Sequence, residues 1–157
     1  SILHCLEESP LEIKPLWGEK FFWSDGSNST TYKVNDYGIV GLIAFDKYGC
    51  SNQNSLEVKT NCPPKFFVPN GFSPNGDNEN DVMGIYGKYF QNMKLTVFNR
   101  WGEVIYVTTD RYKPWDGFYK GEVMPIDVYN WQATYDSIIE NDKLNPRKQS
   151  GSITLIR

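Results

Sequence analysis

The chain has 157 residues, of which 39% are hydrophobic, 15% aromatic and 22% charged, and its formal net charge is -3. This length fits one domain or two small ones, and the apolar fraction is sufficient for packed cores. The negative charge argues against a nucleic-acid binder, which needs a basic surface, and no apolar run approaches the roughly 20 residues that span a bilayer.

Short runs of β-branched and aromatic residues, separated by turn residues, predict strands along the whole chain. No long window keeps helical spacing of apolar positions without an interrupting Gly, Pro or Asn. In the first half the predicted strands are 11–14, 20–24, 31–35, 38–46 and 55–60. In the second half they are 65–68, 94–99, 103–108, 128–136 and 152–156.

Two of these strands alternate clearly between apolar and polar positions. One face of the first carries Tyr129, Trp131, Ala133 and Tyr135, and one face of the second carries Met93, Leu95 and Val97. Because successive side chains of a strand point to opposite faces, each pattern implies one buried and one wet surface. The sequence therefore predicts an all-β fold of antiparallel β-sandwiches.

The boundary between two modules is predicted at Cys62-Pro63-Pro64, since two prolines cannot join a β-ladder and form a short, stiff connection. The expected domains are residues 1–62 and 63–157. Of the three cysteines, Cys5, Cys50 and Cys62, any two can pair, and the residues alone do not choose among the three pairings. No zinc-ligand spacing is present.

Catalytic chemistry finds little support in the sequence. His4 is the only histidine and lies at the extreme N-terminus, where nothing indicates an orienting partner. The chain contains no P-loop, GxGxxG or GxSxG motif. We therefore expect a protein that is not an enzyme and has no catalytic residues.

A loop rich in Asn, Asp and Gly is the strongest local constellation. It places Asn75, Asp77, Glu79 and Asp81 at every second residue, and alternating oxygen ligands in a tight loop are typical of calcium sites. The alternative is a turn whose side chains satisfy the backbone of the loop itself. Calcium is the one cofactor that the sequence suggests.

The tryptophans differ in their context. Trp23 and Trp131 lie in predicted strands and are expected in the core, whereas Trp101 and Trp115 each stand next to turn residues. Such rings either stay exposed, where they stack on a sugar or anchor a partner, or fold back to cap the sandwich.

The second half carries a series of motifs in order: residues 67–77 with Asn80-Asp81, Asn99-Arg100-Trp101-Gly102-Glu103, Trp115-Asp116-Gly117, residues 125–129, and residues 151–157. With these motifs it resembles the gliding motility-associated C-terminal domain, the type B sorting domain of the type IX secretion system of Bacteroidota. Asn78 and Asp127 stand where that family usually has Gly. The first half is more loosely similar to the Ig-like repeats that often precede such domains. By the same resemblance a Cys5–Cys50 disulfide is expected, with Cys50–Cys62 as its rival.

The resemblance implies a sorting signal for export to the bacterial cell surface or beyond, with cargo such as a gliding adhesin. It further implies recognition by an outer-membrane partner of the PorP/SprF type and passage through the type IX translocon. The chain begins at Ser1 without a signal peptide, and we expect it to be the C-terminal part of a longer protein.

The expected partner-binding residues come from three motifs: Arg100, Trp101, Gly102, Trp115, Asp116, Gly117, Ile153, Leu155 and Arg157. The last strand, 152–156, is expected to be able to insert into a partner sheet. The alternative function is a glycan-binding or calcium-dependent adhesive module.

Overall fold

The computed structural model describes residues 1–139 and 143–157, and every regular element in them is a β-strand. The all-β fold predicted from the sequence is thereby confirmed. No helix that is long and apolar enough to cross a membrane occurs in these residues. The chain divides into two compact units, one formed mainly by Ser1–Cys62 and the other by Pro63–Ile138 with Leu144–Arg157.

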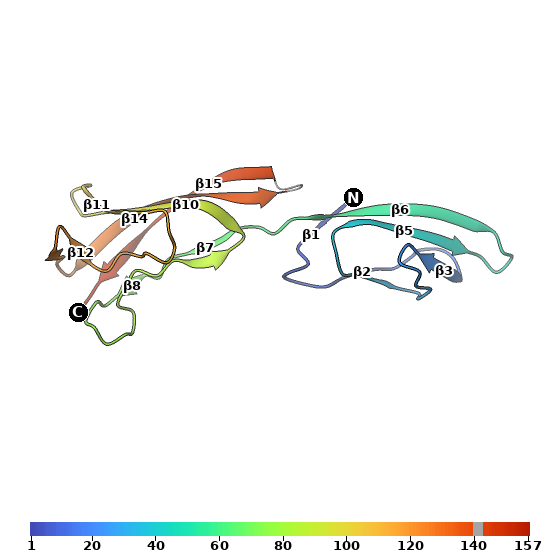
Figure 1. The fold of residues 1–157 in the computed structure, drawn as a ribbon, viewed down its shortest axis with the longest axis horizontal. Helices are drawn as coiled ribbons and strands as arrows, with labels where there is room; N and C mark the ends of the chain where they lie inside the picture. The colour runs from blue at the N-terminus through green and yellow to red at the C-terminus, as the bar shows by residue number, and fades with distance from the viewer. Residues whose placement is uncertain (140–142) are drawn as a thin grey trace. The chain divides into compact units, whose positions relative to one another are not determined.

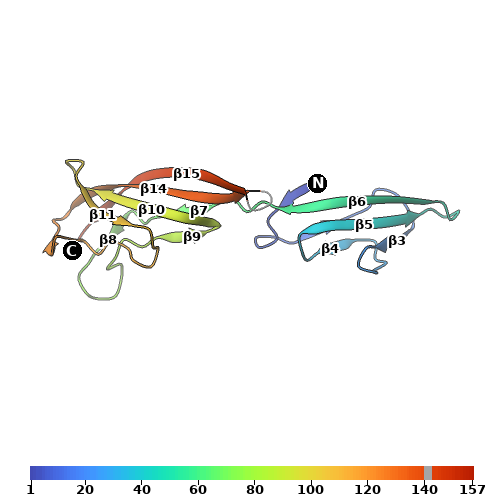
Figure 2. The ribbon, with the colours of Figure 1, turned by 45° about the horizontal axis from the view of Figure 1, so that its top comes forward.

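The N-terminal unit consists of a four-stranded sheet and a separate two-stranded pair. The sheet has the order β1-β6-β5-β3, and β2 pairs with β4. Figure 2 shows β5 and β6 running side by side. The strands are β1 (Ile2–His4), β2 (Leu11–Ile13), β3 (Lys20–Trp23), β4 (Tyr32–Val34), β5 (Gly38–Phe45) and β6 (Ser51–Thr60).

The core of this unit is small. Its buried cluster consists of Trp23, Val34, Val40 and Val58. Trp23, which the sequence places in the core, is buried there, and its indole Nε1 donates a 2.8 Å hydrogen bond to the carbonyl oxygen of Ser29. Phe21 and Ala44 are also buried in this unit. So small a core gives limited hydrophobic stabilisation, which makes a covalent cross-link valuable.

That cross-link joins Cys5 to Cys62, so the expected Cys5–Cys50 pairing is wrong. The reason is the parallel pairing of β1 with β6, in which His4 lies opposite Thr60. This register brings the Cα atoms of Cys5 and Cys62 to 4.8 Å from each other. Cys50 precedes β6 at its other end, roughly 30 Å of strand away, and is free and exposed.

The C-terminal unit is built on a five-stranded sheet of order β11-β10-β14-β15-β8, beside the pairs β12–β13 and β7–β9. Figure 1 shows β10, β14 and β15 lying next to one another. The strands are β7 (Lys65–Phe67), β8 (Gly71–Phe72), β9 (Tyr86–Lys88), β10 (Phe90–Phe98), β11 (Val104–Thr108), β12 (Phe118–Tyr119), β13 (Glu122–Val123), β14 (Asp127–Ile139) and β15 (Lys143–Leu155).

One face of this sheet carries the core of the unit. The two alternating patterns seen in the sequence are confirmed, since Tyr129, Trp131, Ala133 and Tyr135 of β14 and Met93, Leu95 and Val97 of β10 are all buried. Antiparallel register places Leu95 opposite Ala133 and Val97 opposite Trp131. The strands therefore contribute a continuous apolar layer, on which the segments outside the main sheet pack.

Candidate functional site

The hairpin turn between β10 and β11 holds an exposed tryptophan in a fixed place. The Oδ1 atom of Asn99 accepts hydrogen bonds from the backbone N–H groups of Trp101 (3.0 Å) and Glu103 (2.9 Å). The backbone of Gly102 has φ +78°, a conformation that glycine adopts without strain. The turn is thus closed by its own side chains, and Trp101 projects from it with 83% of its surface exposed.

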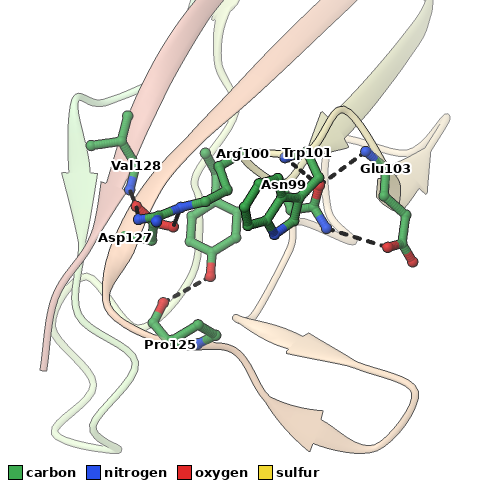
Figure 3. Close-up of polar contacts among 8 residues, drawn as sticks. Asn99, Arg100, Trp101, Glu103, Pro125, Asp127 and Val128 are labelled. Atoms are coloured by element: carbon green, nitrogen blue, oxygen red, sulfur yellow. Dashed lines mark hydrogen bonds and ion pairs between the residues drawn. The ribbon is translucent and has the colours of Figure 1, made fainter.

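Arg100, the neighbour of Trp101, ties this turn to the start of β14. Its Nε and Nη2 atoms donate hydrogen bonds of 2.7 and 2.8 Å to the two carboxylate oxygens of Asp127 (Figure 3). Asp127 also accepts the N–H of Val128 at 2.8 Å. The hydrogen bond from Arg100, followed by the one from Val128, holds the pKa of Asp127 below its usual value. Bidentate pairing of this kind fixes both the distance and the orientation of the two segments.

An open cleft of about 380 Å³ lies beside this ion pair. We call it the Trp101 cleft; it is lined by Trp101, Arg100, Asp127, Pro125, Ile126 and Tyr129, together with Asn99 and Met124. The hydroxyl of Tyr129 donates a 2.7 Å hydrogen bond to the carbonyl oxygen of Pro125 and so holds the opposite wall. Figure 3 shows Arg100 and Trp101 on one side of the site and Pro125 on the other.

Four of the nine residues expected to bind a partner are buried instead. Trp115 has no exposed surface; its ring packs 4.9 Å from that of Tyr129 and 5.4 Å from that of Phe72. The indole Nε1 of Trp115 donates a 2.9 Å hydrogen bond to the carbonyl oxygen of Phe118. Gly117 is also buried, beside Pro74 and Leu155. Of the two alternatives for Trp115, the structure shows the ring folded back into the core, where the backbone of Trp115 bridges to Met83, so this side chain is not accessible to a partner.

The expected role of the last strand is likewise corrected. Ile153 and Leu155 are completely buried. Thr154 and Leu155 pair in parallel with Gly71 and Phe72 of β8, while β14 lies on the other side of β15. Because both sides of the end of β15 are occupied, it cannot insert into another sheet without leaving its own. Arg100, Trp101, Gly102, Asp116 and Arg157 remain exposed.

The loop after β8 is organised around Asp81. The carboxylate of Asp81 accepts hydrogen bonds from the backbone N–H groups of Asn75 (3.0 Å), Gly76 (2.9 Å) and Asn78 (2.7 Å). Burial pushes the pKa of Asp81 upward, but these hydrogen bonds outweigh it and the pKa lies below its usual value. The residue Asn78 has φ +67°, which explains why glycine also suits this position.

The other candidate calcium ligands also bind the loop backbone. Asn75 Oδ1 accepts the N–H of Asp77, and Asp77 Oδ1 accepts the N–H of Glu79. Within residues 1–139 and 143–157, the group of ligating side chains close enough to hold a metal is Cys5, Glu7 and Cys62, of which both cysteines are cross-linked. These contacts favour the self-satisfied turn, while calcium binding by Asn75, Asp77, Glu79 and Asp81 stays a prediction.

The replacement Asp81→Ala distinguishes the two explanations. We expect it to lower the Tm by the same amount with and without saturating calcium, because it removes the acceptor of three loop N–H groups. The measurement is a thermal melt followed by circular dichroism. A rise in the Tm of the unmodified protein with calcium, abolished by Asp77→Ala, would instead establish a bound ion.

The effect of Asp81→Ala on the Tm should depend on pH. Since the folded pKa of Asp81 is depressed, its contribution to stability is fully present above the unfolded value of about 4. The contribution is lost as the pH falls through the lower folded pKa. The Tm difference between the protein and Asp81→Ala should therefore shrink in acid, and a difference that stays constant would contradict this role.

His4, the only histidine, lies beside Ser9. Its Nε2 atom is 2.9 Å from the carbonyl oxygen and 3.3 Å from the hydroxyl of Ser9. Both residues are on the surface of the N-terminal unit. In the part of the chain that the structure describes, Ser9 is the hydrogen-bond partner of the imidazole, and no carboxylate orients the ring as a general base requires.

These features define an all-β module that carries a rigidly held, solvent-facing tryptophan beside an ion pair. The sequence profile of the CHU_C type IX secretion signal domain matches residues 66–155, more than half of the chain. The chain belongs to this family, as the motifs in the sequence indicate. No significant match to a curated protein was found.

Membership in the family assigns the general role of the C-terminal unit. It is a sorting signal for type IX secretion, so the protein is exported to the cell surface or the extracellular space and interacts with the secretion machinery. The family is described as one of secretion signals.

Proposed function

We propose that residues 63–157 form the sorting domain of a cell-surface protein such as a gliding adhesin, and that residues 1–62 are an Ig-like repeat preceding it. An outer-membrane protein of the PorP/SprF type recognises the sorting domain through the Trp101 cleft. The translocon then moves the attached chain outward. The observation that carries this proposal is the exposure of Trp101 on a turn that side-chain hydrogen bonds hold rigid.

Three properties of the Trp101 cleft support recognition by a protein. Tryptophan and arginine are the residues that most often dominate the binding energy of an interface. The Arg100–Asp127 pair and the Asn99 turn fix the cleft before binding, so that little conformational entropy is lost on association. The neighbouring Ile126 is also largely exposed and adds apolar surface.

The test is an export assay in a bacterium with a type IX secretion system. The full chain is fused behind a secreted reporter, and the reporter on the cell surface is compared with the total by immunoblotting. Replacing Trp101 with alanine is expected to reduce surface delivery at least tenfold, since hot-spot truncations cost about 2 kcal/mol or more. The same replacement should leave the Tm of the purified chain unchanged.

Tyr112→Ala is the matched control, because Tyr112 is 85% exposed and lies outside the Trp101 cleft. It should be exported normally. Normal export of Trp101→Ala would refute the role of the cleft, and equal loss in both variants would show a general dependence on surface aromatics. Truncation of the last residues is a weaker test, because it removes the buried Ile153 and Leu155 and is expected to destabilise the domain.

A further inference from the structure

The N-terminal unit carries a second group of exposed aromatic rings that its core does not use. Trp17 is 47% and Tyr48 79% exposed, and neither belongs to the buried cluster of the unit or to the side chains packed against it. Trp17 lies in the segment between β2 and β3, and Tyr48 in the turn between β5 and β6. Both residues line one open cavity of about 480 Å³.

A second cavity adjoins the first. It has a volume of about 600 Å³ and is lined by Phe22, Phe45 and Tyr48. The two cavities share Glu19, Asp46, Lys47 and Tyr48 in their linings, so Tyr48 stands where they meet. We call the two cavities together the Trp17–Tyr48 site. The volume of each cavity is in the range of small-ligand sites. Because the two cavities adjoin, together they suit an elongated ligand.

The two loops of this site are held in place before any ligand arrives. Gly18 has φ +106° and lies so close to Ala44 and Phe21 that a Cβ atom would meet them at 3.0 and 3.1 Å. The next residue, Glu19, donates a 2.7 Å backbone hydrogen bond to the carbonyl oxygen of Phe45. These contacts fix the segment that carries Trp17 against β5.

The turn with Tyr48 is fixed by a carboxylate. Oδ1 of Asp46 accepts the backbone N–H groups of Tyr48 (2.8 Å) and Cys50 (2.9 Å). Lys47 places its Nζ atom 5.0 Å from the centre of the Tyr48 ring. Aromatic side chains on such rigid loops provide contact area at a low cost in conformational entropy.

The composition of the site identifies its ligand class. Glu19, Lys20, Asp46 and Lys47 line the site beside the aromatic rings. Glutamate, aspartate and lysine are depleted in the cores of protein–protein interfaces, so this lining fits a protein partner poorly. A saccharide matches both parts of the lining, because the C–H face of a pyranose packs on an aromatic ring while its hydroxyl groups bond to carboxylates and ammonium groups. The net charge of -3 disfavours a polyanion.

We propose that the Trp17–Tyr48 site of the N-terminal unit binds a neutral polysaccharide, with the rings of Trp17 and Tyr48 stacking on successive sugars. This function is separate from secretion and from the Trp101 cleft. It gives the exported protein a means of holding a carbohydrate surface after its delivery.

Affinity electrophoresis of the full chain tests this directly. Native gels contain barley β-glucan, xylan or galactomannan, and migration is compared with a gel without polysaccharide. At least one of the three polysaccharides is expected to retard the protein, with a dissociation constant that isothermal titration calorimetry then measures. Trp17→Ala and Tyr48→Ala should each weaken that binding at least tenfold without changing the Tm, since both rings lie outside the core.

Two controls separate this site from the other features of the chain. Tyr112→Ala removes an equally exposed aromatic ring from the C-terminal unit, and Trp101→Ala removes the exposed ring of the Trp101 cleft; both should be retarded as strongly as the unmodified protein. Migration unaffected by all three polysaccharides would overturn the proposal, as would retardation that persists in Trp17→Ala. Concentration-dependent dimerisation lost in Trp17→Ala, seen by sedimentation, would reassign the site to protein contacts.

Discussion

Replacing Cys5 and Cys62 together with serine is expected to destabilise the N-terminal unit by about 4 kcal/mol, because the bond closes a long loop in the unfolded chain. The two cysteines are 57 residues apart in sequence. Among its described residues the unit has a small buried cluster of four side chains, so this loss is a large part of its total stability. Hydrogen–deuterium exchange followed by mass spectrometry should show peptides from β5 and β6 losing protection, while those from β10 and β14 keep it.

Cys50→Ser is the matched control, since Cys50 is exposed and unpaired. Its exchange pattern should match that of the unmodified protein. Protection lost in Cys50→Ser to the same extent as in the double variant would mean that Cys50 takes part in the disulfide. Reduction with dithiothreitol should reproduce the behaviour of the double variant in the unmodified chain.

Trp115→Ala is expected to destabilise the C-terminal unit by about 3–5 kcal/mol, the range for truncating a buried aromatic residue. The replacement leaves a cavity next to Phe72 and Tyr129, whose rings contact Trp115. It also removes the indole donor for the carbonyl oxygen of Phe118. Urea denaturation monitored by the protection of β10 and β14 measures the change.

Trp101→Ala is the control for Trp115→Ala, because it removes another tryptophan from the same unit. Because Trp101 is almost wholly exposed, its replacement should change the unfolding free energy by no more than about 0.5 kcal/mol. The two variants thereby separate stability from recognition, since only Trp101→Ala should impair export of a well-folded domain. A large destabilisation by Trp101→Ala would show that its ring packs on the unit.

The buried faces of the long strands could be predicted because they depend on local sequence alone. Tyr129, Trp131, Ala133 and Tyr135 recur with period two, and that period is the geometry of a single strand. Trp23 could be assigned to the core for the same reason. The motif at Asn99–Glu103 could be located from its sequence, and its exposed position follows from the hairpin turn that its own side chains close.

The disulfide and the burial of Trp115 depend on contacts between distant segments. Cys62 reaches Cys5 because β1 pairs in parallel with β6, and β1 has only three residues and a weak sequence signal. Trp115 stands beside turn residues, yet its backbone forms a bridge to Met83 and its ring lies in the buried core cluster of the unit. In both cases the two contacting residues are far apart in the sequence, so local sequence patterns could not identify the contact.

The two departures from the family pattern also find physical explanations. Asn78 occupies a left-handed backbone conformation that asparagine tolerates better than most residues. Asp127 supplies the carboxylate that Arg100 binds, a contact that glycine could not make. The Arg100–Asp127 ion pair is therefore a feature of this chain that sequence comparison with glycine-containing relatives would not suggest.

The sequence predicts the last strand over residues 152–156, whereas β15 begins at Lys143. Its sequence contains Pro146 together with Lys143, Arg147 and Lys148, which in isolation indicate a loop. In the sheet, β8 pairs with β15 only at Thr154 and Leu155, so the side of β15 away from β14 is open along most of its described length. Proline and positive charges are the residues that an open strand edge accommodates and that discourage aggregation.

The Cys5–Cys62 bond has a mechanical consequence for a protein that works outside the cell. Tension applied to the two ends of the chain passes from Cys5 to Cys62 through the sulfur atoms and bypasses the residues between them. Without the disulfide, a pulling force could extend those residues to roughly 190 Å. While the bond is intact, the N-terminal unit therefore transmits a pulling force as a short, nearly inextensible link.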